Sequence, residues 1–121
     1  MTRITLFRIA AGLCFLAVAL GAFGAHALKA TLQASGMLEV WNKAVLYHLV
    51  HSVALVALAL HGTGNRAACF FIIAGILFFS GSLYVMALIP HQRDWLGAIT
   101  PLGGLCFLAG WGWLILSPPK M

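Results

Sequence analysis

The sequence predicts an all-α integral membrane protein, folded as a compact bundle of four transmembrane helices. Of its 121 residues, 63% are hydrophobic and only 7% are charged, and its mean hydropathy is +1.03. An ordinary soluble domain carries about 25% charged residues, so this composition cannot cover a surface that faces water. It therefore excludes a soluble enzyme, a secreted disulfide scaffold, a disordered tail and a DNA-binding domain.

Four apolar runs are each long enough to cross a bilayer. We expect transmembrane helices at approximately residues 4–28, 38–60, 67–89 and 95–116. Each run has about 20 residues or more, which at about 1.5 Å per residue matches a hydrocarbon layer about 30 Å thick. These spans use most of the chain, so residues 1–121 are expected to form a single transmembrane domain with short loops.

The first run resembles a secretory signal peptide at both of its ends. Arg3 and Arg8 give it a basic start, and Ala25-His26-Ala27 resembles a cleavage site. The apolar stretch is, however, longer than the hydrophobic region of a typical signal peptide. We therefore expect it to be retained as the first transmembrane helix, which Lys29 closes.

Turn-forming residues separate the later runs. Ser35-Gly36 precedes the second helix, residues 61–66 separate the second from the third with Asn65 as a candidate N-cap, and Pro90 ends the third. In the fourth run, Pro101 allows two interpretations. It either sits in a continuous helix that loses one backbone hydrogen bond, or begins a shorter helix after Thr100.

The few polar residues inside the spans concentrate in the half of the membrane next to residues 29–37 and 90–94. Polar groups in lipid must pair with one another, so residues at matching depth are candidate partners. On the second helix, His48 and His51 are spaced i, i+3 and share a face. We expect one polar pocket in this half of the membrane, with candidate residues His26, Trp41, Tyr47, His48, His51, Ser80, Ser82, Tyr84 and Thr100.

The histidine pair has several possible roles. The first is a structural role, in which the histidines form hydrogen bonds between helices. The second is the handling of a proton, a metal or a small ligand. The third is haem ligation. No carboxylate lies beside the pair to orient it, and Cys14, Cys69 and Cys106 form no CxxC motif. We therefore predict no metal site and no cofactor.

Motifs for catalysis are missing from the sequence. It contains no glycine-rich phosphate loop, no G-x-S-x-G elbow, no paired carboxylates and no H-E-x-x-H motif. We therefore predict a protein that is not an enzyme. Glycines on several helix faces permit close approach by another helix, which favours a homo-oligomer or a larger membrane complex.

Positive charge is scattered singly and suits a membrane better than a nucleic acid. The formal net charge is +5, but the basic residues form no stripe, so we expect membrane lipids and no nucleic acid as partners. Arg3, Arg8, Arg66 and Lys120 fall on the side of the termini, against Lys29, Lys43 and Arg93 on the other side. The positive-inside rule then predicts that both termini are cytoplasmic.

Four motifs in order carry a resemblance to a known family: GAFGAHALK from Gly21, W-x-K-A-V-x-Y-H-x-x-H from Trp41, F-S-G-S-L-Y from Phe79, and I-T-P-L-G-G from Ile99 followed by G-W at Gly110 and Trp111. Together they resemble the bacterial small membrane proteins of domain-of-unknown-function family 423, similar to eukaryotic transmembrane protein 256. The resemblance covers nearly the whole chain. It implies a multi-pass protein of the inner (plasma) membrane, without an agreed activity, substrate or cofactor.

Three functional hypotheses follow from the residues and the resemblance. The first is a bundle without enzymatic activity that binds a lipid or small ligand in its polar pocket. The second is an accessory or assembly subunit of a larger membrane complex. The third is a protein that handles protons or a metal through its intramembrane histidines, and the lack of a buried acid counts against it.

Overall fold

A computed structural model describes residues 1–62, 65–89, 91 and 93–121 of the chain. Its elements, in order, are α1 (Arg3–Ala25), α2 (Lys29–Ala34), α3 (Leu38–His61), α4 (Arg66–Gly75), the π-helix η1 (Ile76–Ser80), α5 (Gly81–Leu88) and α6 (Arg93–Leu116). Because α4, η1 and α5 follow one another without a break, the described residues form four helices long and apolar enough to cross a membrane. The predicted four-span all-α fold is confirmed.

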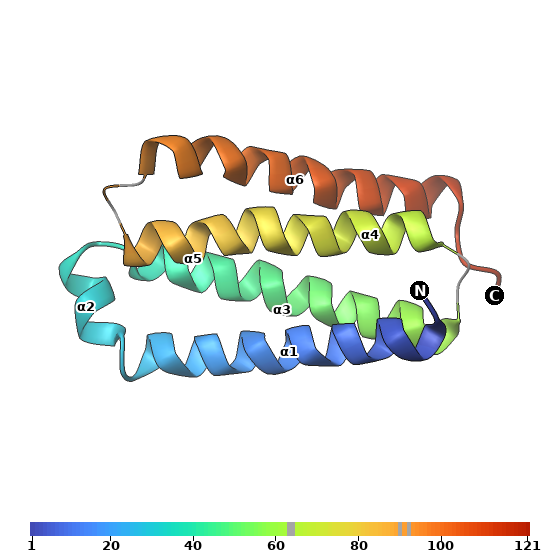
Figure 1. Cartoon of the computed structure of the whole chain (residues 1–121), viewed down its shortest axis with the longest axis horizontal. Helices are drawn as coiled ribbons and strands as arrows, with labels where there is room; N and C mark the ends of the chain where they lie inside the picture. Colours follow the sequence, from blue (N-terminus) through green and yellow to red (C-terminus); the bar gives the residue numbers. More distant parts are fainter. Residues whose placement is uncertain (63–64, 90, 92) are drawn as a thin grey trace.

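The four long helices run side by side along the length of the molecule (Figure 1). Both chain termini lie at one end, which we call the terminal end, together with the connection from α3 to α4. The opposite end, which we call the α2 end, holds α2 and the connection from α5 to α6. The connection between the first two spans and the connection between the last two spans therefore lie on the same side of the bundle, as the sequence predicted.

The first span ends earlier than the sequence suggested. The helix α1 ends at Ala25 instead of Leu28, and the unpredicted helix α2 follows at Lys29. Leu32 on α2 is fully buried beside Met37 and Trp41, so this short helix is fastened to the bundle by one apolar side chain. Gly36 then turns the chain with a φ of 72°, a left-handed conformation that glycine adopts without steric cost.

Helices α1 and α3 pack closely because α1 presents small residues to α3. Ala10, Ala17 and Gly24 are all buried on one face of α1, at the regular spacing of an antiparallel helix pair. A Cβ atom at Gly24 would lie only 2.3 Å from Nε1 of Trp41 on α3. The indole of Trp41 therefore occupies space that any side chain at position 24 would fill.

Helix α6 approaches the π-helix η1 through another glycine. A Cβ atom at Gly103 would lie 2.2 Å from the backbone nitrogen of Phe79, so backbone meets backbone at this crossing. Pro101 lies inside α6, which continues through it from Arg93 to Leu116. The interpretation of a shorter helix that begins after Thr100 is therefore wrong. Thr100 instead donates a hydrogen bond of 3.2 Å to the carbonyl of Leu96, one turn back in the same helix.

The outer surface of the bundle is apolar on all of its long helices. Large side chains such as Phe15 on α1, Val53 on α3, Leu77 on η1 and Ile115 on α6 are exposed. In water this surface would be unfavourable, whereas in a bilayer it faces lipid chains. The exposed apolar side chains on the four long helices therefore form the surface that contacts the membrane.

Candidate functional site

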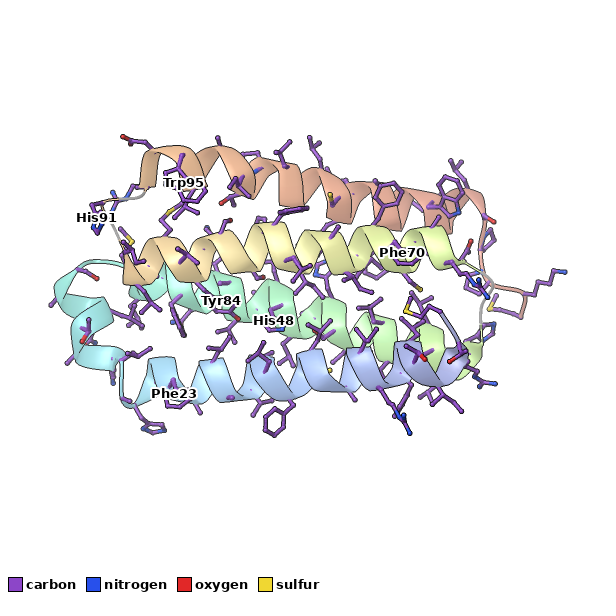
Figure 2. The ribbon with its side chains drawn as sticks, in the orientation of Figure 1. Phe23, His48, Phe70, Tyr84, His91 and Trp95 are labelled. Atoms are coloured by element: carbon purple, nitrogen blue, oxygen red, sulfur yellow. The ribbon has the colours of Figure 1, made fainter. Side chains whose placement is uncertain are left out.

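His48 and Tyr84 form a buried pair between α3 and α5. Figure 2 shows the two side chains close together in the interior of the bundle, and a hydrogen bond of 2.9 Å joins Nδ1 of His48 to the Tyr84 hydroxyl. The Tyr84 ring also packs edge-on against Trp41, with 4.9 Å between the ring centroids. Trp41 in turn donates a hydrogen bond of 2.9 Å to the carbonyl of Leu20 on α1. These contacts tie α1, α3 and α5 together.

The second ring nitrogen of His48 has no hydrogen-bond partner among the described residues. His48 is only 1% exposed, and its Nε2 atom is buried. The backbone carbonyl of Leu13 on α1 lies near this ring, but Nε2 makes no hydrogen bond of normal geometry with it. An unpaired buried polar atom costs free energy, so this is a point of strain in the α1–α3 contact.

His51, although it lies one turn further along α3, has partners on a different helix. Nε1 of Trp111 on α6 donates a hydrogen bond of 3.0 Å to Nε2 of His51. The His51 ring also stacks on Phe107, with 3.7 Å between the centroids. Neither Trp111 nor Phe107 is among the candidate residues that the sequence predicted.

The partners of His51 fix its protonation. An indole N–H can only donate, so Nε2 of His51 must accept from Trp111. The proton then sits on Nδ1, which lies 2.7 Å from the carbonyl oxygen of Tyr47 and donates to it. Both ring nitrogens are thus satisfied in a neutral imidazole, and the arrangement serves as a structural link between α3 and α6.

The serines of the third span also form contacts inside the bundle. Ser80 is fully buried at the end of η1 and donates a hydrogen bond of 2.8 Å to the carbonyl of Ala44 on α3. Ser82 points to the other side, where its hydroxyl lies 2.6 Å from that of Thr100 on α6. One serine therefore links the third span to α3 and the other links it to α6.

Tyr47 differs from the other candidate residues. Its ring lies against Phe79, with 4.6 Å between the centroids, and the side chain is 40% exposed on the outside of the bundle. No hydrogen-bond partner for its hydroxyl is present among the described residues. Tyr47 begins a row of rings that continues through His51 and Phe107 to Trp111, which we call the aromatic row.

A cavity adjoins the terminal end of the aromatic row. It has a volume of about 440 Å³ and is lined by α3, α6 and the C-terminal segment. Its lining residues are Ala54, Ala57, Leu58, His61, Trp111, Leu114, Pro118, Pro119 and Met121. Trp111 is thus shared by the aromatic row and the cavity. Apart from the His61 and Trp111 rings, the lining side chains are apolar.

The structure distributes the candidate pocket residues over several contacts. His26 is exposed at the C-terminal cap of α1, outside the bundle, because the helix ends there. His48 faces α5, whereas His51 faces α6, so the described polar side chains form separate contacts instead of lining one cavity. A 300° rotation between residues three apart leaves their side chains about 60° apart, which is enough to reach different neighbouring helices.

The described residues also contain no group of three or more His, Cys, Asp or Glu side chains that could hold a metal ion. The three cysteines are free thiols, with Cys69 buried and Cys14 and Cys106 partly exposed. The chemistry that the arrangement offers is therefore hydrogen bonding and apolar contact. No described carboxylate accompanies the intramembrane histidines.

Known proteins resemble this chain over most of its length. A family described as "Protein of unknown function (DUF423)" matches residues 20–104. The chain is 45% identical to the UPF0382 membrane protein SH2409 of Staphylococcus haemolyticus, over 95% of this chain and 96% of that protein. It is 36% identical to the UPF0382 membrane protein C1782.12c of Schizosaccharomyces pombe, over 93% of this chain and 99% of that protein.

A third relative is named by its membrane. The chain is 39% identical to the UPF0382 inner membrane protein YgdD of Escherichia coli, over 88% of this chain and 83% of that protein. No solved structure matches the chain. Several residues of the four sequence motifs make the helix contacts described above, among them Gly24, Trp41, Ser80, Tyr84 and Gly103.

Proposed function

We propose, from the premise that this chain belongs to the DUF423 family of membrane proteins, that it binds a lipid or another lipophilic molecule on the α3–α6 side of its bundle. The carrying observation is Tyr47, a partly exposed side chain whose hydroxyl has no hydrogen-bond partner among the described residues. The proposed role is binding, without catalysis.

The depth of Tyr47 in the membrane means that its hydroxyl needs a hydrogen-bond partner. Tyr47 lies nine residues after Leu38, the first residue of α3, so its backbone is roughly 14 Å into the helix. Polar groups at this depth cannot pair with water or with lipid headgroups, and they cost free energy unless they find a partner. A bound lipophilic molecule with a hydrogen-bonding group at this depth would supply that partner.

The aromatic row and the neighbouring cavity suit such a molecule. A planar group can lie on the rings of Tyr47 and Phe79, which are exposed and partly exposed respectively. A chain attached to it can extend along Trp111 into the cavity of about 440 Å³ at the terminal end. Lipophilic ligands are typically held by apolar and aromatic walls with a few polar groups, which is the composition found here.

The histidines support binding over catalysis. Both nitrogens of His51 are engaged by groups that neither gain nor lose a proton near neutral pH, the backbone carbonyl of Tyr47 and the indole of Trp111. His48 is enclosed between α1, α3 and α5 and cannot touch a molecule on the α3–α6 side without a movement of the helices. Neither residue is therefore placed as a catalytic group next to the proposed ligand.

Two matched tyrosine variants test the proposal. The full chain, purified from its own membrane in mild detergent, is examined by native mass spectrometry for small adducts that it retains. We expect Tyr47→Phe, which removes one unpaired hydroxyl, to lower retention of an adduct roughly 3- to 15-fold, the value of one membrane hydrogen bond. The control Tyr84→Phe removes a hydroxyl that pairs with His48 inside the bundle, and should leave retention unchanged while lowering stability.

Two results would contradict the proposal. One is equal adduct retention by the wild-type chain and Tyr47→Phe. The other is a protein that carries no small adduct but travels with other protein subunits, which would favour the accessory-subunit hypothesis. Thermal unfolding of each variant in the same detergent shows that a lost adduct does not reflect a lost fold.

A further inference from the structure

The two ends of the bundle differ in charge. The sequence has only two acidic residues, Glu39 in the first turn of α3 and Asp94 in the first turn of α6, and both lie at the α2 end. The half of the bundle toward the terminal end carries Arg3, Arg8 and Arg66, and Lys120 follows α6 there, with no acidic side chain. The charged side chains of the terminal end are therefore all basic.

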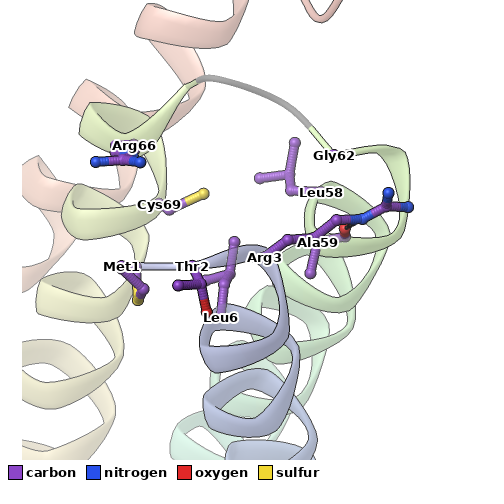
Figure 3. A pocket seen from close by; sticks show the side chains of 9 residues that line it. All are labelled: Met1, Thr2, Arg3, Leu6, Leu58, Ala59, Gly62, Arg66 and Cys69. Atoms are coloured by element: carbon purple, nitrogen blue, oxygen red, sulfur yellow. Dashed lines mark hydrogen bonds between the residues drawn. The ribbon is translucent and has the colours of Figure 1, made fainter.

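A cavity of about 210 Å³ opens at this end between α1, α3 and α4 (Figure 3). Cys69 on α4 and Leu58 on α3 face each other across it, and Arg66 lies on its α4 side. Arg3 and Ala59 complete the opposite wall. The cavity thus has an apolar floor and two arginines among the residues that line it.

The two arginines differ in their hydrogen-bond contacts. Arg3 is engaged in the fold, because Nε donates a hydrogen bond of 2.8 Å to the carbonyl of Ala59 and Nη2 donates to that of Leu60. These carbonyls belong to the last turn of α3, whose C-terminal end attracts a cation. Arg66 is exposed and has no hydrogen-bond or ion-pair partner among the described residues.

The position of Arg66 is unfavourable for its own helix. It is the first residue of α4, where the positive end of the helix dipole adds to the charge of the guanidinium. Helix stability therefore gives no reason for a cation here. An anion beside Arg66 would be attracted by the side chain and by the helix end together.

An apolar groove continues from the same site along the outside of the bundle. It has a volume of about 600 Å³, and it shares Thr2, Arg3 and Ala59 with the cavity. The rest of its wall is Ile4, Phe7 and Leu60. A cavity with arginines among its lining residues at the terminal end, and an apolar groove that leads from it toward the hydrocarbon, match the two parts of a phospholipid.

From these contacts we propose that the terminal end binds an anionic phospholipid. Its phosphate lies beside Arg66 at the cavity between α1, α3 and α4, and one acyl chain lies in the groove past Ile4 and Phe7. The site is separate from the aromatic row on the α3–α6 side, so either proposal stands without the other. It also links the charge of the terminal end to the leaflet that is rich in anionic lipids.

Charge-neutral variants at the two ends provide the test. The full chain in mild detergent is mixed with phosphatidylglycerol or with phosphatidylcholine of the same acyl chains, and native mass spectrometry measures the bound fraction. We expect Arg66→Gln to lower phosphatidylglycerol binding about fivefold, the contribution of one basic residue at a membrane surface. The control Lys43→Gln removes an exposed charge near the α2 end and should leave this binding unchanged.

The outcomes separate a lipid site from weaker explanations. Equal losses in Arg66→Gln and Lys43→Gln would show diffuse attraction by net charge and would overturn the proposal. Equal binding of the two phospholipids would overturn the role of anionic charge. Displacement of phosphatidylglycerol by millimolar inorganic phosphate would replace the lipid by a free anion. The lipid site would be supported if phosphatidylglycerol stays bound in the presence of phosphate and if only Arg66→Gln lowers its binding.

Discussion

Replacement of Gly24 by alanine is expected to destabilise the bundle through a single contact. The new Cβ atom would lie 2.3 Å from Nε1 and 2.5 Å from Cδ1 of Trp41. The Trp41 ring is almost completely buried between Leu20, whose carbonyl accepts a hydrogen bond from the indole N–H, and Tyr84, whose ring contacts it edge-on. It therefore has no free space into which to move.

The size of the effect follows from three contributions. Overpacking of a buried site costs about 1–3 kcal/mol, and loss of the hydrogen bond from Trp41 to Leu20 costs about 0.6–1.7 kcal/mol in a membrane. The higher helix propensity of alanine returns about 1 kcal/mol. We expect Gly24→Ala to lower the free energy of unfolding by about 1–4 kcal/mol.

Gly12 on the same helix supplies the control. A Cβ atom at Gly12 would meet nothing within 4 Å, so Gly12→Ala changes helix propensity without changing a contact. We expect this variant to be neutral or to gain up to about 1 kcal/mol. Unfolding of both variants in mixed micelles, followed by tryptophan fluorescence, measures the difference. Equal stabilities of Gly24→Ala and Gly12→Ala would refute the close contact of Gly24 with Trp41.

The remaining predictions concern pairs of residues and the orientation of the chain. A double-mutant cycle of His51→Phe and Trp111→Phe should give a coupling energy of about 0.6–1.7 kcal/mol, and additive losses would contradict their hydrogen bond. A cycle of Ser82→Ala and Thr100→Val should give a coupling of similar size, whereas the pair Ser82→Ala and Trp111→Phe should be additive. A reporter fused after Met121 should be active in the cytoplasm, and a signal from a reporter that works only in the periplasm would reverse the proposed orientation.

The number of spans was predictable because the bilayer itself sets the length of each apolar run. The short helix α2 was not, because its six residues carry no repeating apolar pattern and only Leu32 is buried. The π-helix η1 was also missed, since its sequence, from Ile76 to Ser80, is as apolar as an ordinary transmembrane segment. Gly103 is the one residue that could have pointed to it, because a glycine in mid-span often marks a close backbone approach.

The depth of the candidate residues was predictable, whereas the direction of their side chains was not. Depth follows from counting residues at about 1.5 Å each. The face turns by about 100° per residue, so a small rotation of a helix changes the neighbour that a side chain meets. Counted from the α2 end, where both helices begin, His51 lies roughly 20 Å along α3 and Trp111 roughly 27 Å along α6. The two side chains are long enough to span this difference in depth and form their hydrogen bond.

The unpaired groups, more than the histidines as a class, indicate where function should be sought. Most of the described polar side chains inside the bundle are satisfied by a neighbour, as His51 is by Trp111 and Tyr47, and such contacts stabilise the fold without a ligand. Among the described groups without a hydrogen-bond partner are the buried Nε2 of His48 and the Tyr47 hydroxyl. The first is enclosed on every side, so a ligand reaches it only if α1 separates from α3. The second belongs to a side chain that is 40% exposed, which makes Tyr47 the first residue to test for binding.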